Sequence, residues 1–388
     1  MIKYKSFYFL CLCFILLTGC WDVINIEERG FIIGTAIDIE EDGDEKQPEY
    51  IVTNQMVIPA GIANQNQGGV GGEEKAFLNF TSKGKSIYEV NEELSAISSK
   101  TPFYEHLAIL VISEDVARKE HLFSDLIDIY IRDVDMRRGI KVIVSEADAK
   151  QLLDFTTPED KLPARHIDEL LDHSTKEIGV LRSKRVGDIE EYHIREKSFV
   201  LPLLHVNEYV DYKAGAVFHG PKDKMVGIFH AEEMQGLEMM KTKAIEKVIE
   251  FTYKDYVFAL EVNDLNNKLA VDPSNIDEIK VTIDIEIEGI IKESFGKIDL
   301  TKPSELKAIQ KAVSEQVKDS VEKAIKKGQE ELGTDVFNIW QNLETKHYDT
   351  WKNIKDDWEK GEYYFKKATF EVNVVTDVFS MGTTNKTD

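Results

Sequence analysis

The segment Ile279-Lys280-Val281-Thr282-Ile283-Asp284-Ile285-Glu286-Ile287-Glu288 alternates without a break between an aliphatic and a polar residue. A period of two places successive side chains on opposite faces of a strand, so this segment predicts a β-strand with one buried and one solvated face. Such a strand is typical of an antiparallel sheet that is covered on one side only.

The segment that follows this strand predicts a helix that covers the sheet. Pro303 and Ser304 open a long amphipathic pattern, and Gly333 suits the C-terminal cap of the helix. Apolar residues recur in it every three or four positions: Leu306, Ile309, Val313, Val317, Val321 and Ile325. The pattern predicts a helix of about 28 residues, roughly 42 Å long, lying across the sheet.

The remaining elements of this half predict an α+β region. Upstream, 257–262 and 269–271 flank Asn266-Asn267, a pair typical of a hairpin turn. Downstream, Trp340, Trp351 and Trp358 lie on predicted helical segments and are interpreted as core residues. A last strand is predicted around Phe370, Val372 and Val374.

In the N-terminal half, strand and helix patterns alternate, which predicts an α/β layer with helices covering a sheet. The strands are expected at 31–38, 50–58, 106–112, 140–144 and 200–204, and the helices at 87–97, 123–130 and 147–155. A hairpin at 213–229 and a helix at 232–240 are expected to begin the next region.

The predicted fold is therefore multi-domain, α/β and α+β, with mixed sheets each covered by helices and a long helix across an antiparallel sheet in the C-terminal domain. We expect a signal peptide at 1–19, an N-terminal α/β region at 20–205 and a C-terminal α+β region at 206–388. An alternative division splits the last region near residue 264.

The N-terminus predicts export and lipid anchoring. Lys3 and Lys5 precede an apolar stretch, 7–17, which is too short for the roughly 20 residues of a membrane-spanning helix. Leu17-Thr18-Gly19-Cys20 fits a lipobox, so Cys20 is predicted to become the N-palmitoyl, S-diacylglycerol cysteine of the mature protein, where two acyl chains anchor stably. The alternative is a plain signal peptide, or a buried N-terminal helix, with a chance cysteine.

Charge and cysteine content argue against nucleic-acid binding, against electrostatic binding to anionic lipid and against thiol chemistry. The net charge is −23, and removal of Lys3 and Lys5 with the signal peptide takes it to −25. Such a surface repels nucleic acid and anionic lipid headgroups, and no basic stripe is present. Cys11 and Cys13 lie in the segment predicted to be removed, so lipidation of Cys20 leaves no thiol for catalysis, metal binding or redox switching.

Catalytic and metal motifs are weak. The sequence contains neither a His-Glu-x-x-His helix nor a Gly-x-Ser-x-Gly elbow, and the glycine-rich stretch 65–72 lacks the Lys-Ser/Thr ending of a phosphate loop. His166 and His173 are seven residues apart among acidic residues, which only weakly indicates a metal site. We predict no catalytic residue, no metal ligand and no cofactor. The charged cluster 132–138 is interpreted as an ion-pair network, with an interface as the alternative.

The chain resembles the Ger(x)C family of spore-germination lipoproteins, the C subunits of nutrient germinant receptors. The stretches that carry the resemblance keep their order along nearly the whole chain: Gly19-Cys20-Trp21-Asp22, 34–38, 106–114, 131–133, 214–218 and 329–337, with Trp351 and Trp358 beyond them. One departure is Asn338-Ile339-Trp340, where the family often has a glycine-containing stretch.

The resemblance implies three mixed α/β domains in an elongated arrangement and no enzymatic activity. It implies a protein anchored by lipid on the outer surface of the inner spore membrane through Cys20. Its expected partners are integral-membrane A and B subunits, with which it would serve nutrient-triggered germination. Residue reasoning leaves two alternatives open: a solute-binding lipoprotein that delivers a small ligand to a transporter, and a cell-envelope hydrolase. Trp21 beside the anchor is expected to rest at the membrane interface.

Overall fold

The computed structural model describes residues 25–40, 48–63, 75–157, 160–173, 182–241, 247–294 and 298–379. The predicted signal peptide, Cys20, Trp21 and the glycine-rich stretch 65–72 lie outside the described residues. Within the described part of the chain, no helix has both the length and the apolar character needed to cross a membrane.

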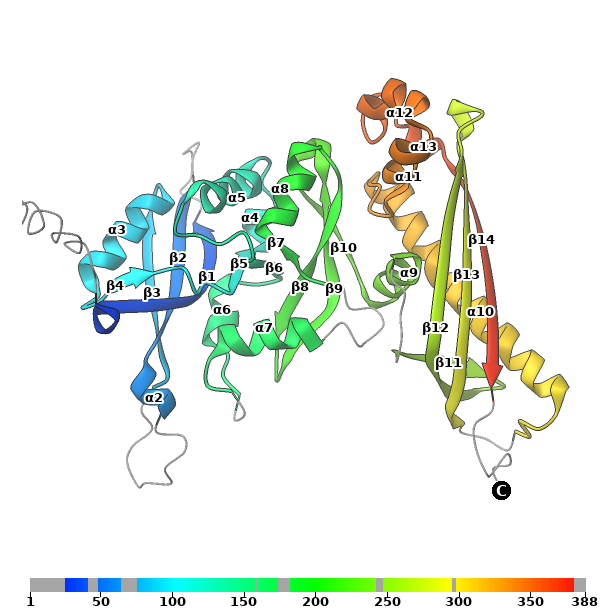
Figure 1. The fold of residues 1–388 in the computed structure, drawn as a ribbon, viewed down its shortest axis with the longest axis horizontal. Helices are drawn as coiled ribbons and strands as arrows, with labels where there is room; N and C mark the ends of the chain where they lie inside the picture. The colour runs from blue at the N-terminus through cyan, green and yellow to red at the C-terminus, as the bar shows by residue number, and fades with distance from the viewer. Residues whose placement is uncertain are drawn as a thin grey trace, which may run out of the picture.

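A large mixed sheet forms the N-terminal part of the molecule (Figure 1). Its strand order is β10-β9-β8-β6-β5-β1-β2-β3, with β4 paired to β1 and β7 to β6. The pairs β1/β5, β5/β6, β6/β8 and β1/β4 are parallel and the others antiparallel. The strands are β1 Arg29–Glu40, β2 Glu49–Val57, β3 Phe77–Gly84, β4 Thr101–Phe103, β5 Ile109–Ser113, β6 Lys141–Ser145, β7 Lys184–Arg185, β8 Phe199–Val206, β9 Val210–His219 and β10 Lys224–Phe229.

Helices cover both faces of this sheet, as the alternation of patterns predicts (Figure 1). One face is covered by α3 (Ile87–Ile97), α4 (Glu114–Arg118), α5 (Leu122–Arg132) and α8 (Val186–Ile194), and the other by α6 (Ala149–Asp154) and α7 (Pro163–His173). Strand β5 is buried on both sides, with Leu110 and Ile112 in one core and Ile109 and Val111 in the other. Three short elements, η1 (Ile26–Glu28), α2 (Pro59–Ala63) and η4 (Gly220–Lys222), also belong to this part.

The second sheet has the order β11-β12-β13-β14. Its strands are β11 Lys247–Tyr253, β12 Tyr256–Asp272, β13 Lys280–Ser294 and β14 Thr369–Phe379. The alternating segment lies in β13 as predicted, with Ile283, Ile285 and Ile287 buried. β14 runs parallel to β13, so the antiparallel arrangement that we predicted holds for the first three strands only.

The predicted long helix is confirmed. Helix α10 (Pro303–Lys326) continues as a π-helix, Lys327–Leu332, and Gly333 ends it in the left-handed region at φ 67°. Val313, Val317 and Val321 of α10 share a core with the buried side of the sheet. A cap of short helices follows: α11 (Ile339–Lys346), α12 (Tyr348–Ile354), η7 (Lys355–Asp357) and α13 (Tyr364–Lys367).

The turn predicted at Asn266-Asn267 is wrong, because β12 runs unbroken from Tyr256 to Asp272. Asn267 donates its side-chain N–H to the carbonyl of Met239, 3.1 Å away, which gives the amide a partner inside a strand. The turn lies instead at Lys254-Asp255, where both residues have positive φ.

The hairpin predicted at 213–229 is confirmed as β9 and β10, but it belongs to another sheet than expected. β9 pairs with β8 and β10 with β9, so the hairpin completes the large sheet instead of opening the C-terminal region. The predicted division at 205/206 lies at the C-terminal end of β8, before its antiparallel partner β9.

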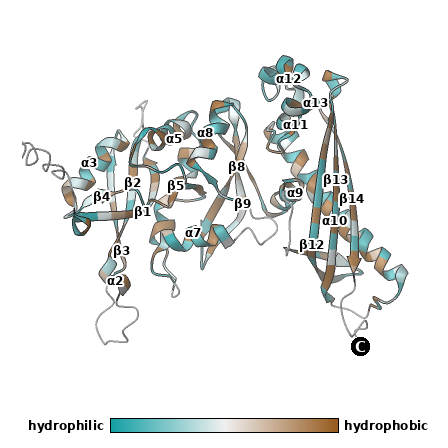
Figure 2. Ribbon diagram, in the orientation of Figure 1, coloured by the Kyte–Doolittle hydropathy of each residue, from teal (hydrophilic) through white to brown (hydrophobic). Residues whose placement is uncertain are grey.

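Helix α9 (Ala231–Lys241) joins the two sheets (Figure 1). Met234 and Leu237 belong to a core that runs from Val217 of the large sheet to the strands of the second sheet. Figure 2 shows both hydrophobic and hydrophilic residues along α10, and Val313, Val317 and Val321 of this helix belong to the same core. The two parts are therefore fastened by shared apolar packing.

Candidate functional site

A buried carboxylate, that of Asp335, organises the junction between the two sheets. It follows the left-handed cap Gly333 and is fully buried. Its Oδ1 accepts the backbone N–H groups of Phe337 and Ile339, each at 3.2 Å. Its Oδ2 accepts the backbone N–H of Trp340 at 2.7 Å and the indole N–H of Trp358 at 2.9 Å. One side chain thus satisfies the start of α11 and fixes the cap helices.

A second buried carboxylate, Glu359, connects this centre to the large sheet. Its Oε1 accepts the backbone N–H of Asp335 at 2.6 Å and the hydroxyl of Ser198 at 2.5 Å. Ser198 precedes β8, and its oxygen accepts the N–H of Gly220 at 3.0 Å. The chain of bonds from Gly220 to Trp358 therefore crosses the junction. We call Ser198, Asp335, Trp358 and Glu359 the junction cluster.

Burial sets the protonation of the two carboxyls. It raises the pKa of Asp335, although four donors oppose the rise. Burial, followed by repulsion from Asp335, raises the pKa of Glu359 to about 8. Two carboxylates this close do not both ionise easily, so near neutral pH the proton resides mainly on Glu359 and Asp335 carries the charge that the donors favour.

A cleft of about 410 Å³ adjoins the junction cluster. Its walls include the segment 194–197 that precedes β8 and the cap residues Trp351, Trp358 and Glu359. Arg195 bonds Glu344 at 2.6 Å, and Lys360 bonds Glu196 at 2.8 Å. The Lys197 ammonium lies 4.6 Å from the ring centroid of Trp351, and burial lowers its pKa. The cleft thus has an aromatic wall and charges of both signs.

The pKa of Glu359 yields a prediction. In the unfolded chain this carboxyl titrates near its ordinary 4.5, against about 8 in the folded protein. The folded state holds a proton that the unfolded state has released, so stability should fall as the pH rises from about 4.5 towards 8 and then level off. Glu359→Gln retains an acceptor oxygen and cannot ionise. We expect the Tm of Glu359→Gln to fall less than that of the wild type between pH 6 and 9, and to be the higher of the two at pH 9.

Thermal unfolding at successive pH values measures this effect. Glu344→Gln is the matched control, because Glu344 lies in the same cap and is partly exposed in its ion pair with Arg195. It should leave the slope of Tm against pH close to that of the wild type. A Glu359→Gln protein with the wild-type slope would show that Glu359 does not hold the proton.

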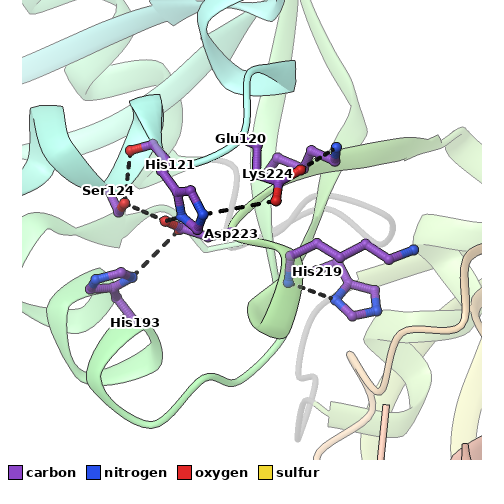
Figure 3. A network of polar contacts seen from close by, with 8 residues as sticks. Glu120, His121, Ser124, His193, His219, Asp223 and Lys224 are labelled. Atoms are coloured by element: carbon purple, nitrogen blue, oxygen red, sulfur yellow. Dashed lines mark hydrogen bonds and ion pairs between the residues drawn. The ribbon is translucent and has the colours of Figure 1, made fainter. Parts of the chain in front are cut away.

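A second polar network surrounds Asp223 (Figure 3). Asp223 ends the turn between β9 and β10 with φ 49°, and its backbone oxygen accepts the N–H of His121 at 3.1 Å. Its Oδ2 contacts His121 Nδ1 at 3.0 Å and accepts the hydroxyl of Ser124. Its Oδ1 lies 3.5 Å from His193 Nδ1. The carboxylate thereby holds α5 and α8 against the hairpin.

This network has the residue types of a hydrolase but not the arrangement. The Ser124 hydroxyl contacts the Asp223 carboxylate and the carbonyl of His121. A serine nucleophile instead needs its hydroxyl on a histidine ring that can accept the proton. The nearby His219 is buried, and burial lowers its pKa to about 4. These contacts are those of a structural clamp.

The residues singled out from sequence are dispersed. Cys20 lies outside the described residues. His166 packs its ring against Phe155, with centroids 6.4 Å apart. Among the residues that the structure describes, no group of three or more His, Cys, Asp or Glu side chains could hold a metal. Within 132–138, Arg132 pairs with Asp128 and Arg138 with Glu190, each at 2.6 Å.

The tryptophans at 340, 351 and 358 are buried, as predicted. Sequence reasoning missed Ser198 and Glu359, which carry no local motif. Asp335 had one signal, an acidic residue two positions after the helix cap Gly333 and directly before the apolar pair Val336-Phe337.

Comparison with known proteins matches the two halves of the chain to two known protein domains. The family model for the spore germination protein N-terminal domain matches residues 22–206, and that for the spore germination B3/GerAC-like C-terminal domain matches 213–382. Relatives in Bacillus subtilis (strain 168) include spore germination protein YndF, 25% identical over 95% of both chains, and spore germination protein B3, 24% identical over 99% of both.

The fold has a solved counterpart. The crystal structure of the GerBC protein aligns with a TM-score of 0.59 at 17% identity and covers 92% of this chain and 99% of that one. Both family domains occur in order along the chain, which belongs to the Ger(x)C family of spore germination proteins.

Proposed function

We propose that this protein is a lipid-anchored, non-enzymatic subunit of a nutrient germinant receptor. It is held on the outer surface of the inner spore membrane by lipid on Cys20, and it assembles with integral-membrane A and B subunits. The observation that carries the proposal is the match of two germination domains at 22–206 and 213–382, directly behind the lipobox that ends at Cys20.

The fold supports a recognition role. Two acyl chains confine the protein to one surface and raise its effective concentration near membrane partners. The junction cluster and the shared core along α9 fix the two sheets against each other. A partner that docks on one sheet is therefore mechanically connected to the other sheet. The Asp335 and Asp223 carboxylates are occupied by internal hydrogen bonds.

Affinity isolation tests the assembly. Tagged protein is recovered from detergent-solubilised inner membranes of dormant spores, and the accompanying proteins are identified. Recovery of a transporter-like multi-pass protein and its soluble-domain partner in equal amounts is expected. Recovery of the lipoprotein alone, while a control membrane complex stays intact, would refute the receptor assignment.

Substitution of Cys20 tests the anchor. Cys20→Ala removes the thiol that would receive the diacylglyceryl group, and the apolar stretch 7–17 is too short for stable insertion. We expect loss of palmitate labelling, loss of partition into the detergent phase, and germination on nutrients reduced to that of a deletion strain. Cys11→Ala and Cys13→Ala are matched controls and should behave as wild type. Undiminished labelling of Cys20→Ala would contradict the assignment.

The cleft beside the junction cluster favours one alternative, a solute-binding lipoprotein. Its charges of both signs and the ring of Trp351 would suit a small zwitterion. Calorimetry of the purified protein with amino acids distinguishes the two functions. Heat that is abolished by Trp351→Ala would support ligand capture, and absence of heat favours the receptor subunit.

A further inference from the structure

The second sheet has a face that its own helices leave uncovered. In β13 the odd-numbered residues are buried beneath α10, so the even-numbered residues point to the opposite side. Strand register places Glu288 directly between Asp264 of β12 and Asp377 of β14. Three carboxylates thus form one row across three neighbouring strands. The adjacent row has Glu286 between Asn266 and Val375.

This row is unfavourable for the fold itself. Neighbouring strands lie about 4.8 Å apart, and like charges directly opposite each other destabilise a sheet. Among the described residues, Glu286, Glu288 and Asp377 form no ion pair, and Asp264 accepts a hydrogen bond from Asn266 at 2.7 Å. The buried isoleucines already specify β13, so packing gives no reason for acidic residues on the outward side.

Exposed apolar side chains accompany the acids. Val375 and Phe379 alternate with Asp377 along β14 and are 58% and 53% exposed. β14 pairs only with β13 among the described strands, so it is an edge of the sheet. Apolar anchors within a charged surround are the anatomy of a protein interface. We call Asp264, Glu286, Glu288, Val375, Asp377 and Phe379 the acidic face.

We propose that the acidic face docks a basic protein surface, a lysine- or arginine-bearing region of a partner subunit of the receptor. Charge complementarity selects this occupant. Anionic headgroups and nucleic acid are repelled by the row of carboxylates. A free cation would neutralise the row but leave Val375 and Phe379 in water, whereas a protein surface neutralises the charge and also covers the apolar side chains. The inference rests on the proposed function, because the partner is a receptor subunit.

The test compares two charge reversals in the full-length protein. Glu286→Lys/Glu288→Lys reverses the acidic face, and Glu92→Lys/Glu93→Lys makes the same change in charge on exposed positions of α3. Tagged proteins are isolated from solubilised dormant-spore membranes. We expect the first variant to recover at least tenfold less of the multi-pass partner than the wild type, and the α3 variant to recover as much as the wild type.

Thermal unfolding separates docking from misfolding. Because the substitutions relieve repulsion, the Tm of Glu286→Lys/Glu288→Lys should equal or exceed that of the wild type. A stable acidic-face variant that retains its partner would overturn this inference and leave the receptor function intact. If the wild type recovers no partner, the receptor function fails as well. Loss of wild-type recovery in EDTA, matching the loss in the charge variant, would identify a bridging divalent cation and overturn the basic-surface proposal.

Discussion

Asp335→Ala is expected to lower the free energy of unfolding by at least about 4 kcal/mol. The substitution leaves three backbone N–H groups and the indole N–H of Trp358 without their acceptor in a buried site. Each buried donor without a partner costs about 1–3 kcal/mol. Relief of the desolvation that raises the pKa of Asp335 offsets part of this loss, but four donors outweigh one buried charge.

Urea unfolding of the purified protein measures the change. Asp349→Ala is the matched control, since Asp349 is an exposed acid in the same cap, on α12, and should cost less than about 0.5 kcal/mol. Asp335→Asn keeps one acceptor oxygen and should fall between the two. An Asp335→Ala protein as stable as Asp349→Ala would mean that the cap helices do not depend on this carboxylate.

Removal of the Asp335 charge should also lower the pKa of the neighbouring Glu359. Repulsion from Asp335 contributes to the raised pKa of Glu359. In Asp335→Asn, the fall of Tm with pH should therefore end at lower pH than in the wild type, while its start, which the unfolded chain sets, stays where it is. A purely structural role for Asp335 would lower Tm at every pH without this displacement.

Local patterns sufficed where burial is periodic along the chain. The alternation at 279–288 identified β13, and the spacing of Ile309, Val313 and Val317 identified α10 with its cap at Gly333. Each of these elements buries one continuous face against one neighbour, so its pattern is contained in its own residues.

The patterns failed where a distant partner satisfies a polar side chain, or where a turn uses residues that are not typical of turns. Asn266-Asn267 has the composition of a turn, yet the carbonyl of Met239 satisfies Asn267 within a strand. The actual turn uses Lys254 and Asp255 in positive φ, residues without the usual asparagine–glycine signal. The pairing of β9 with β8 is local, since Val206 faces Val210 across residues 207–209, but this turn also lacks the asparagine–glycine signal.

The junction cluster was beyond local reasoning for the same reason. Ser198 and Glu359 are 161 positions apart and bond across two sheets. A protein with 71 acidic residues offers many carboxylates of equal appearance. Only the fold shows which of them are buried and which, like Glu288, are placed beside others without compensation.

The packing of α9 on α10 depends on Gly236, where a Cβ would lie 2.1 Å from the backbone oxygen of Ser320 and 2.9 Å from the nitrogen of Val321. Alanine in a helix is otherwise favoured over glycine by about 1 kcal/mol. Because rigid backbone atoms cannot yield, steric overlap should outweigh this preference for alanine. We expect Gly236→Ala to lower the free energy of unfolding by about 2–4 kcal/mol through separation of the two helices.

Gly139→Ala is the matched control, because a Cβ there meets no atom within 4 Å. Urea unfolding should place Gly139→Ala at or above the wild type and Gly236→Ala well below it. If both variants unfold together, α9 does not depend on close contact with α10, and the connection between the sheets must reside in the junction cluster alone.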